Sequence, residues 1–345
     1  MSGTEAGAER RPHPSRRDAH APAPRRALAP LALAAALAAA PALAQTTITV
    51  QHPLPVASHY GAGATALKEA FEAATGGRYR VNIQRNDNER EVIESVQIGT
   101  VDCYIGSTGP VGNFVPETRV FDVPFLFRDY AHARGVLDSD IGQGVLNRFQ
   151  ARGLVGVVWM ENGFRHLTNS RREVHTPADV RGLKVRTMEN QVHMRAFQTL
   201  GALPTPMAFS ELVPALQQGT VDGQENPIPV IVANNLNQVQ RYLTLTGHVY
   251  SPGILICNPD VLRRMSAADR TAFDAAARAG RDANRAKVTA DENSGIEALR
   301  ARGMQVTTSV DTAAFQTALA QAFQVYEREL DGALLRRIRD WRPAS

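Results

Sequence analysis

The stretch Val92–Asp102 reads VIESVQIGTVD, and the stretch Leu212–Asp222, 120 residues later, reads LVPALQQGTVD. The two stretches share their apolar positions, one glutamine and the final Gly-Thr-Val-Asp at the same offsets. Apolar residues at i, i+1 and i+4 form one face of a helix, and a glycine behind them is a common left-handed helix end. Each stretch therefore predicts a helix that stops at its glycine and leads into a short strand.

This echo predicts an α/β protein with two similar lobes. Around the first copy, the strands Thr47–Gln51 and Tyr79–Gln84 are separated by the helix Thr65–Ala74, which is the alternation of a mostly parallel sheet covered by helices. In open α/β sheets, ligands bind beyond the carboxyl ends of the strands. The segments after the two copies, Gly106–Thr108 and Gln224–Pro227, are therefore predicted to face a shared cleft. The alternative is that the echo is ordinary helix-turn-strand sequence.

The second part of the chain carries further elements. Leu154–Met160 is an apolar strand, and Glu161–Gly163 is predicted to be a turn and hinge. Ser210 is predicted to cap the helix of the second copy, and Tyr250–Asn258 to return as a strand to the first lobe. Ser266–Asp269 resembles a capping box with Asp in place of Glu, and it predicts a helix that continues to Ala301 or breaks near Ser294 and Gly295. A helix of that length exceeds the usual range, so it either bends or spans both lobes.

The first 44 residues differ from the rest of the chain. They pass from an arginine- and proline-rich stretch to the Ala/Leu-rich run Ala27–Ala40, and then to Ala42–Ala44. A basic region, an apolar region and an Ala-x-Ala exit are the parts of a secretory signal peptide. We expect export of the chain and cleavage near Ala44. An uncleaved anchor is the alternative, although the apolar run is short for a membrane span of about 20 residues.

Without that segment the chain is almost neutral. The full sequence has 345 residues, 43% of them hydrophobic, and a formal charge of +4. Residues 1–44 supply +3 of that charge, which leaves +1 for the remainder. A nearly neutral protein has no electrostatic footprint for nucleic acid or for an anionic membrane, so these partners are excluded.

The two cysteines, Cys103 and Cys257, each lie in an apolar, strand-like run. Export would permit a disulfide. Buried free cysteines nevertheless behave as small hydrophobic residues, and nothing in the sequence places the two Cα atoms close together. The sequence therefore favours two free thiols and leaves the bridge open.

Signatures of cofactors and metals are weak. Gly61–Ala66 matches a relaxed dinucleotide fingerprint, but that fingerprint needs its glycines directly at the strand-to-helix turn, and prolines and Ser58 intervene here. His52 and His59 flank a proline-rich loop and lack the spacing of zinc ligands. We therefore predict neither a cofactor nor a metal.

Two arginines are the strongest candidates for ligand binding. Arg165 follows the predicted hinge, and Arg186 ends a strand with apolar neighbours. A guanidinium group binds a carboxylate through two parallel hydrogen bonds. The alternative for each is an exposed arginine paired with a surface acid. Asn226 and Phe209 are weaker candidates, because such residues often serve the backbone or the core.

Several blocks of the sequence together resemble a known family. They are Asn162–Arg165 (NGFR), Gly182–Arg186 (GLKVR), Thr205–Glu211 (TPMAFSE), Val221–Pro227 (VDGQENP) and Val239–Leu243 (VQRYL). These blocks resemble the periplasmic receptor subunits of TRAP transporters, the tripartite ATP-independent periplasmic carriers, in their C4-dicarboxylate/sialate receptor family. The resemblance runs from about Ile48 to beyond Gln305.

The resemblance implies a two-lobed periplasmic binding protein of the Venus-flytrap type, with strand crossovers and a long helix linking the lobes. Residues 1–44 would be the signal peptide. Lobe 1 would comprise residues 46–162 plus 251–290, and lobe 2 residues 163–250 plus 291–345. The mature protein would be a periplasmic monomer.

The same resemblance assigns the carboxylate-binding arginine of the family to Arg186. The other ligand-binding positions it implies are Arg165, Phe209 and Asn226 in lobe 2 and His52, Glu89, Arg90 and Ser107 in lobe 1. Sialate-binding members carry an acid at the position of Ser107 and an asparagine at that of Pro53. A large amino sugar acid is therefore not expected, and a sugar acid or a C4-dicarboxylate is.

The implied function is capture of an organic-acid anion and its delivery to the membrane permease of a TRAP transporter, driven by an ion gradient. Such a receptor makes and breaks no bonds and needs no cofactor or metal. Its mature chain does not insert into the membrane. Two alternatives remain open: a ligand-sensing subunit for a signalling kinase, and an enzyme that acts on organic acids.

Overall fold

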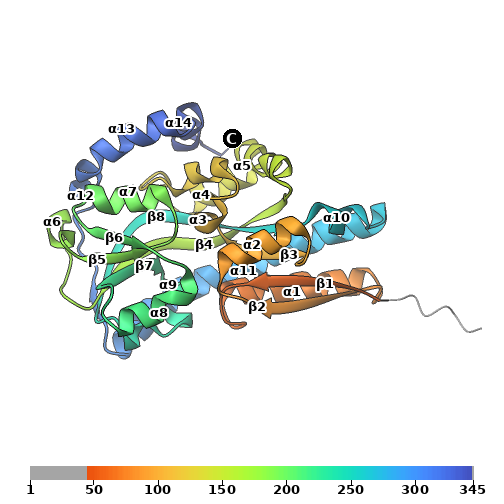
Figure 1. Ribbon diagram of the computed structural model, residues 1–345, viewed down its shortest axis with the longest axis horizontal. Coiled ribbons are helices and arrows are strands. Elements are labelled where there is room, and N and C mark those ends of the chain that lie inside the picture. Colours follow the sequence, from red (N-terminus) through yellow and green to blue (C-terminus); the bar gives the residue numbers. More distant parts are fainter. Residues whose placement is uncertain (1–44, 344–345) are drawn as a thin grey trace, which may run out of the picture. The chain divides into compact units, whose positions relative to one another are not determined.

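The computed structural model describes residues 45–343 (Figure 1). The predicted signal peptide and its cleavage site lie outside these residues. Within the described part, no helix combines the length and the apolar character needed to cross a membrane.

The described strands form one mixed sheet in the order β2-β1-β3-β8-β4-β7-β5-β6, with β9 also paired to β8. The strands are β1 (Thr46–His52), β2 (Tyr79–Arg85), β3 (Cys103–Ser107), β4 (Val155–Asn169), β5 (Lys184–Thr187), β6 (Leu203–Pro206), β7 (Gly223–Pro227), β8 (Tyr242–Cys257) and β9 (Gln305–Thr307).

Helices cover this sheet. The α-helices are α1 (His59–Ala74), α2 (Glu89–Ile98), α3 (Thr108–Val111), α4 (Tyr130–Asp138), α5 (Asp140–Leu146), α6 (Pro177–Val180), α7 (Gln191–Thr199), α8 (Phe209–Gln217), α9 (Ile228–Ala233), α10 (Pro259–Arg263), α11 (Ala267–Ala301), α12 (Thr312–Ala318), α13 (Ala320–Glu329) and α14 (Gly332–Asp340). The 3-10 helices are η1 (Pro116–Asp122), η2 (Asn147–Arg152) and η3 (Leu236–Gln238).

The sheet has two similar halves. In the first half, residues 46–154, β1 pairs in parallel with β2 and β3. In the second half, residues 170–241, β5 pairs in parallel with β6 and β7. The long strands β4 and β8 run antiparallel between the halves and belong to both. The predicted mixed α/β fold is confirmed.

The repeat that suggested two lobes occupies the same place in each half. Helix α2 ends at Gly99 (φ 84°) and leads to β3, while α8 is followed by Gly219 (φ 71°) and β7. Positive φ values are those that glycine adopts without a steric penalty. The predicted Ser210 cap is wrong: α8 begins at Phe209, and the carboxylate of Glu211 accepts a hydrogen bond from the backbone N–H of Ala208 (3.0 Å).

The predicted turn at Glu161–Gly163 is also wrong, because β4 continues through it. Strand β4 pairs with β8 on both sides of this point, and the register shifts between Glu161 and Gly163. Gly163 has a φ of 121°. The glycine therefore marks a β-bulge inside one long strand, where an extra residue is absorbed without ending the pairing.

Helix α1 begins six residues before the predicted start at Thr65. The hydroxyl of Ser58 accepts a hydrogen bond from the N–H of Gly61 (3.2 Å) and caps the helix. A Cβ atom on Gly63 would lie 3.0 Å from the carbonyl oxygen of Gly280 in α11. The glycines of this segment therefore belong to a helix that packs closely on α11, and they do not form a phosphate-binding turn.

The long helix α11 is continuous from Ala267 to Ala301 and spans both halves (Figure 1). It contacts α1 in the first half and α9 in the second. As predicted, Ser266 caps it: the hydroxyl accepts a hydrogen bond from the N–H of Asp269 (3.1 Å). At Gly295 the helix packs closely on Ile228 of α9.

Cys103 and Cys257 form a disulfide, which corrects the expectation of two free thiols. The two residues face each other across the antiparallel pair β3–β8, and both are fully buried. Because β3 and β8 are 154 residues apart in sequence, only the sheet pairing brings the two cysteines together.

Reduction of this disulfide is expected to lower the free energy of unfolding by about 2 to 4 kcal/mol, because the bridge closes a long loop in the unfolded chain. Chemical denaturation with and without a reductant measures the effect. The Cys103→Ala/Cys257→Ala variant should match the reduced protein and should not respond to the reductant. Equal midpoints for the oxidised and reduced wild-type protein would contradict the expectation.

Candidate functional site

A small cavity lies where the two halves meet. Its volume is about 20 Å³, which is room for roughly one water molecule. The first half and the second half both contribute lining residues: Pro53, Leu54, Tyr60, Glu89, Ser107, Asn162, Arg186, Met188, Phe209, Asn226 and Val230. Ser107 and Asn226 come from the two segments predicted to share a cleft, and that prediction is confirmed.

Arg186 is the cation of this cavity. Its side chain is only 1% exposed, and Nε and Nη2 donate to the carbonyl oxygen of Met207 (3.1 and 2.8 Å). Its Cζ atom lies 5.8 Å from the centre of the Phe209 ring, and its Nη1 has no hydrogen-bond partner. Burial lowers the pKa of Arg186 to about 10, so it stays protonated at neutral pH. Within residues 45–343 no carboxylate lies within ion-pair distance of it.

Arg165 lies behind the cavity and does not line it. It is fully buried and paired with Glu225, with 2.9 Å between Nη2 and Oε1. Its Nη2 also donates to Oδ1 of Asn226 (3.2 Å), which does line the cavity. The charge of Arg165 is therefore balanced, and its effect on the cavity passes through Asn226.

The carboxylate of Glu225 is held ionised. Burial by itself would raise its pKa, but Arg165 and the neighbouring histidines keep that pKa well below the usual value. Nε2 of His248 lies 3.2 Å from Oε2 of Glu225, and Nδ1 of His193 lies 3.6 Å from Oε1. Arg165 and Glu225 neutralise each other, so Arg186 is the cation that lines the cavity, with the carboxyl group of Glu89 in the same lining.

Glu89 faces Arg186 from the first half. It is the first residue of α2, is buried, and accepts a hydrogen bond from the hydroxyl of Tyr104 (2.6 Å). Burial raises the pKa of Glu89. The hydroxyl of Tyr60 has no partner, and that of Ser107 contacts only the sulfur of Met188 (3.5 Å). The cavity thus combines one cation with groups able to bind hydroxyls.

The family model for bacterial extracellular solute-binding proteins of family 7, DctP, matches residues 50–329 of the chain. The chain belongs to this receptor family. Its similarity to individual members is high over nearly the whole matched region, so the assignment does not depend on short motifs.

A solute-binding protein of Verminephrobacter eiseniae is 49% identical to the receptor over 298 residues, covering 86% of this chain and 89% of that protein. A TRAP periplasmic solute-binding protein from Polaromonas sp. JS666, solved with bound D-erythronate, is 50% identical, with a TM-score of 0.85 and coverage of 87% of this chain and 100% of that chain. A TRAP periplasmic solute-binding protein from Bordetella bronchispeptica, with density interpreted as pantoate, has the same identity, TM-score and coverage.

These comparisons confirm the predicted class. The fold is that of the two-lobed TRAP periplasmic binding proteins, and the chain is a solute-binding receptor rather than an enzyme. Members of the family bind organic acids such as erythronate, galactonate and succinate.

Besides Arg165, two further residues predicted to bind ligand, Arg90 and His52, lie outside the lining of the cavity. Arg90 is exposed, pairs with Glu94 (3.2 Å) and borders an adjoining recess that also contains Arg186. His52 is fully buried, and neither of its ring nitrogens has a partner. Burial lowers the pKa of His52 to about 4.

The buried histidines His52 and His59 should make the receptor less stable as the pH falls. Burial lowers the pKa of His59 to about 3 and that of His52 to about 4, while the unfolded chain takes up protons near pH 6.5. Each histidine therefore removes about 1.4 kcal/mol of stability per pH unit below 6.5. Denaturant unfolding at pH 7.5 and 5.5 should show a loss of about 2 to 3 kcal/mol. The His52→Gln/His59→Gln variant should show a clearly smaller loss, and an equal loss would contradict the assignment.

Several lining residues were not predicted from the sequence, among them Tyr60, Asn162 and Met188. Tyr60 lies in the first turn of α1, which the sequence analysis began at Thr65. The Ser58 cap was the signal that could have placed it. Asn162 was assigned to a turn, and Met188 reaches the cavity only because β5 ends one residue earlier. Nothing in the spacing of Met188 indicates this position.

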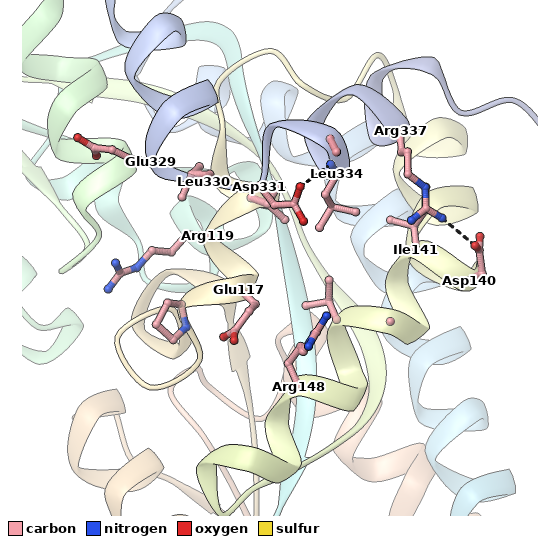
Figure 2. A pocket seen from close by; sticks show the side chains of 15 residues that line it. Glu117, Arg119, Asp140, Ile141, Arg148, Glu329, Leu330, Asp331, Leu334 and Arg337 are labelled. Atoms are coloured by element: carbon pink, nitrogen blue, oxygen red, sulfur yellow. Dashed lines mark hydrogen bonds and ion pairs between the residues drawn. The ribbon is translucent and has the colours of Figure 1, made fainter.

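A larger hollow of about 480 Å³ lies elsewhere, between η1 and α5 on one side and the α13–α14 pair on the other (Figure 2). Several of its charged side chains interact with other groups of the protein. Arg337 pairs with Asp140 (2.8 Å), and Asp331 accepts from the N–H of Leu334 (2.9 Å) at the start of α14. The hollow shares no residue with the Arg186 cavity. The larger hollow also has no residue in common with the predicted ligand-binding residues.

Proposed function

We propose that the chain is a periplasmic receptor that captures a short hydroxy carboxylate between its lobes and delivers it to a TRAP permease. The observation that carries this proposal is the buried guanidinium of Arg186, whose Nη1 has no hydrogen-bond partner and which forms no ion pair with a carboxylate of residues 45–343. A buried charge is costly unless it is paired. A ligand carboxylate supplies both the missing acceptor and the missing charge.

The ligand class follows from the two relatives that are 50% identical. The names of their structures state D-erythronate and pantoate. Both molecules are acids on a four-carbon chain with hydroxyls at carbons 2 and 4. The first half offers Glu89, Ser107 and Tyr60 as partners for such hydroxyls. We therefore place short 2-hydroxy acids first, ahead of uronates, six-carbon aldonates and C4-dicarboxylates.

The proposed mechanism is closure around the ligand. Lobe 1 comprises residues 46–162 plus 251–290, and lobe 2 residues 163–250 plus 291–345. Arg186, with Arg165 acting through Asn226, binds the carboxylate in lobe 2. Glu89 and its neighbours in lobe 1 then form hydrogen bonds with the hydroxyl groups of the ligand. These residues are close enough to do so only when the lobes close. Ligand therefore shifts the population toward the closed form. The small cavity and its lining from both halves support this order of events.

A thermal-shift and calorimetry panel tests the proposal. The panel contains D-erythronate, pantoate, glycerate, galactonate, glucuronate, succinate and the neutral polyol erythritol. A ligand at a free concentration of 100 times its Kd should raise the free energy of unfolding by about 2.7 kcal/mol. We expect erythronate or pantoate to bind most tightly and erythritol, which lacks the carboxylate, not to bind. Equal stabilisation by erythritol, or by none of the acids, would overturn the proposal.

Export and permease coupling are separate parts of the proposal. The family is periplasmic, and the signal peptide is predicted to end near Ala44. Amino-terminal sequencing of the protein from a periplasmic extract should place the first residue next to that position. Uptake of the bound acid by cells that carry the cognate permease should require the receptor and collapse when the ion gradient is dissipated.

A further inference from the structure

Asp122, the last residue of η1, is a fully buried carboxylate whose close partners are neutral groups. Oδ1 accepts a hydrogen bond from the hydroxyl of Thr108 (2.7 Å), and Oδ2 accepts one from the amide of Asn190 (2.8 Å). The nearest ring nitrogen, Nε2 of His193, is 3.9 Å away, and within residues 45–343 no lysine or arginine pairs with Asp122. Burial raises its pKa. A buried carboxylate without a cationic partner is costly to the fold, so its position calls for a role.

The partners of Asp122 come from different halves of the sheet. Asp122 and Thr108 belong to the first half, whereas Asn190 and His193 lie at the start of α7 in the second half. Asn190 and His193 are 2% and 1% exposed, so water is excluded from the contact. We call Asp122, Asn190 and His193 the latch.

The latch is continuous with the arginine of the cavity. Arg186 lies in β5, which ends at Thr187, and α7 begins a few residues later at Gln191. Oδ1 of Asn190 accepts from the N–H groups of Val192 and His193 (2.9 and 3.2 Å) and thereby caps α7, while its Nδ2 donates to Asp122. One side chain therefore fixes the helix start and the contact with the first half.

The latch also reaches the second arginine. His193 lies between two carboxylates, with Nε2 facing Asp122 (3.9 Å) and Nδ1 facing Oε1 of Glu225 (3.6 Å). Glu225 in turn pairs with Arg165. A single carboxylate of the first half is thus connected to the elements that carry Arg186 and Arg165. Asp122 itself does not line the cavity.

We propose that Asp122 is a positioning residue that holds the second half, through Asn190 and His193, against the first half once ligand is bound. This inference rests on the proposed function. The latch joins groups that meet only when the halves come together, so it acts after ligand has entered. It should therefore slow ligand dissociation and leave the association rate almost unchanged.

Stopped-flow binding of D-erythronate tests this proposal with the Asp122→Leu variant, which replaces the carboxylate by an apolar side chain of similar size. We expect dissociation to be about 10 to 100 times faster and association to change less than threefold. Thr118→Val is the matched control, because Thr118 is also buried in η1 but donates only to the local carbonyl oxygen of Val115 (2.9 Å). It should leave both rates unchanged. A slower association with unchanged dissociation in Asp122→Leu would overturn the proposal.

An exchange of the two groups separates a latch from a merely structural role. Asn190→Asp alone places two carboxylates together and should speed dissociation at least as much as Asp122→Leu. The Asp122→Asn/Asn190→Asp variant restores one donor and one acceptor across the contact, and dissociation should return to within about threefold of wild type. Failure of the exchange to restore dissociation, with melting temperatures equal to wild type, would refute the pairing.

A distance between labels provides a measurement that does not depend on affinity. Cysteines introduced at the exposed positions Glu94 in α2 and Gln217 in α8 carry a pair of spin labels, since Cys103 and Cys257 are bridged and buried. Asp122→Leu should lengthen the distance distribution in the presence of D-erythronate. If wild type binds none of the acids, the proposed function fails. The latch is then decided by the closed conformation that the ligand-free protein populates, and Asp122→Leu must lower that short-distance population.

Discussion

The Arg186→Ala variant is expected to bind D-erythronate about 100 to 4000 times more weakly than wild type. Arg186 forms no ion pair with a carboxylate of residues 45–343, and its Nη1 is the donor left for a ligand carboxylate. Removing one partner of a buried charge pair costs about 3 to 5 kcal/mol, and 1.4 kcal/mol is a factor of ten. Titration calorimetry measures the effect.

Two further variants make the Arg186 result specific. Arg186→Lys keeps the charge but loses the planar fork, so affinity should fall to an intermediate value. Arg90→Ala removes an exposed arginine that borders the adjoining recess and pairs with Glu94. This substitution should change the affinity less than threefold. Binding by Arg186→Ala within tenfold of wild type, or a larger loss from Arg90→Ala, would remove Arg186 from its assigned role.

Glu225→Ala is expected to destabilise the fold by about 3 to 5 kcal/mol and to weaken ligand binding. The substitution leaves the fully buried guanidinium of Arg165 without its carboxylate partner, and an unpaired buried charge carries its full desolvation cost. His248, whose Nε2 lies 3.2 Å from Oε2 of Glu225, also loses this hydrogen-bond partner. Denaturant unfolding measures the stability change.

A double-mutant cycle shows whether this cost belongs to the pair. Arg165→Met/Glu225→Leu should be more stable than Glu225→Ala alone, because both charges are removed together, with a coupling of about 1 to 3 kcal/mol. Asp274→Ala is the matched exposed control, since Asp274 pairs with Arg270 at i, i+4 on the surface of α11. It should change stability by about 0.5 kcal/mol or less. Additive effects of the single Arg165 and Glu225 variants would contradict the buried pair.

Local features of the sequence were sufficient for much of the fold. The Val92–Asp102 and Leu212–Asp222 stretches predicted the two helix-glycine-strand units, because apolar spacing and a glycine helix end act over a few residues. The Ser266 cap and the uninterrupted pattern behind it likewise predicted α11. Errors arose where one residue type serves two local structures. Gly163 was assigned to a turn and is a β-bulge, and the glycines of α1 were assigned to a loop and lie within a helix.

The sequence predicted the kinds of residue at the candidate site, but only part of their arrangement in space. Residues near strand ends, such as Ser107 and Asn226, meet as expected because strand order brings those ends together. Arg165 was predicted to bind ligand beside Arg186, and the structure shows it buried and paired with Glu225. Arg165 and Glu225 are 60 positions apart in the sequence. No local pattern indicates which acidic residue will form an ion pair with a buried arginine.

The sequence alone thus determined the α/β class, the two repeated units and the receptor family, and it predicted Arg186 as the leading anion-binding residue. Each of these depends on short-range spacing or on motifs within single segments. The tertiary structure decided which groups meet across the chain: the bond between Cys103 and Cys257, the pairing of Arg165 with Glu225, and the contact of Asp122 with Asn190. Those contacts depend on how strands far apart in sequence lie side by side. Burial then sets the charge of each group, which its position in the chain does not reveal.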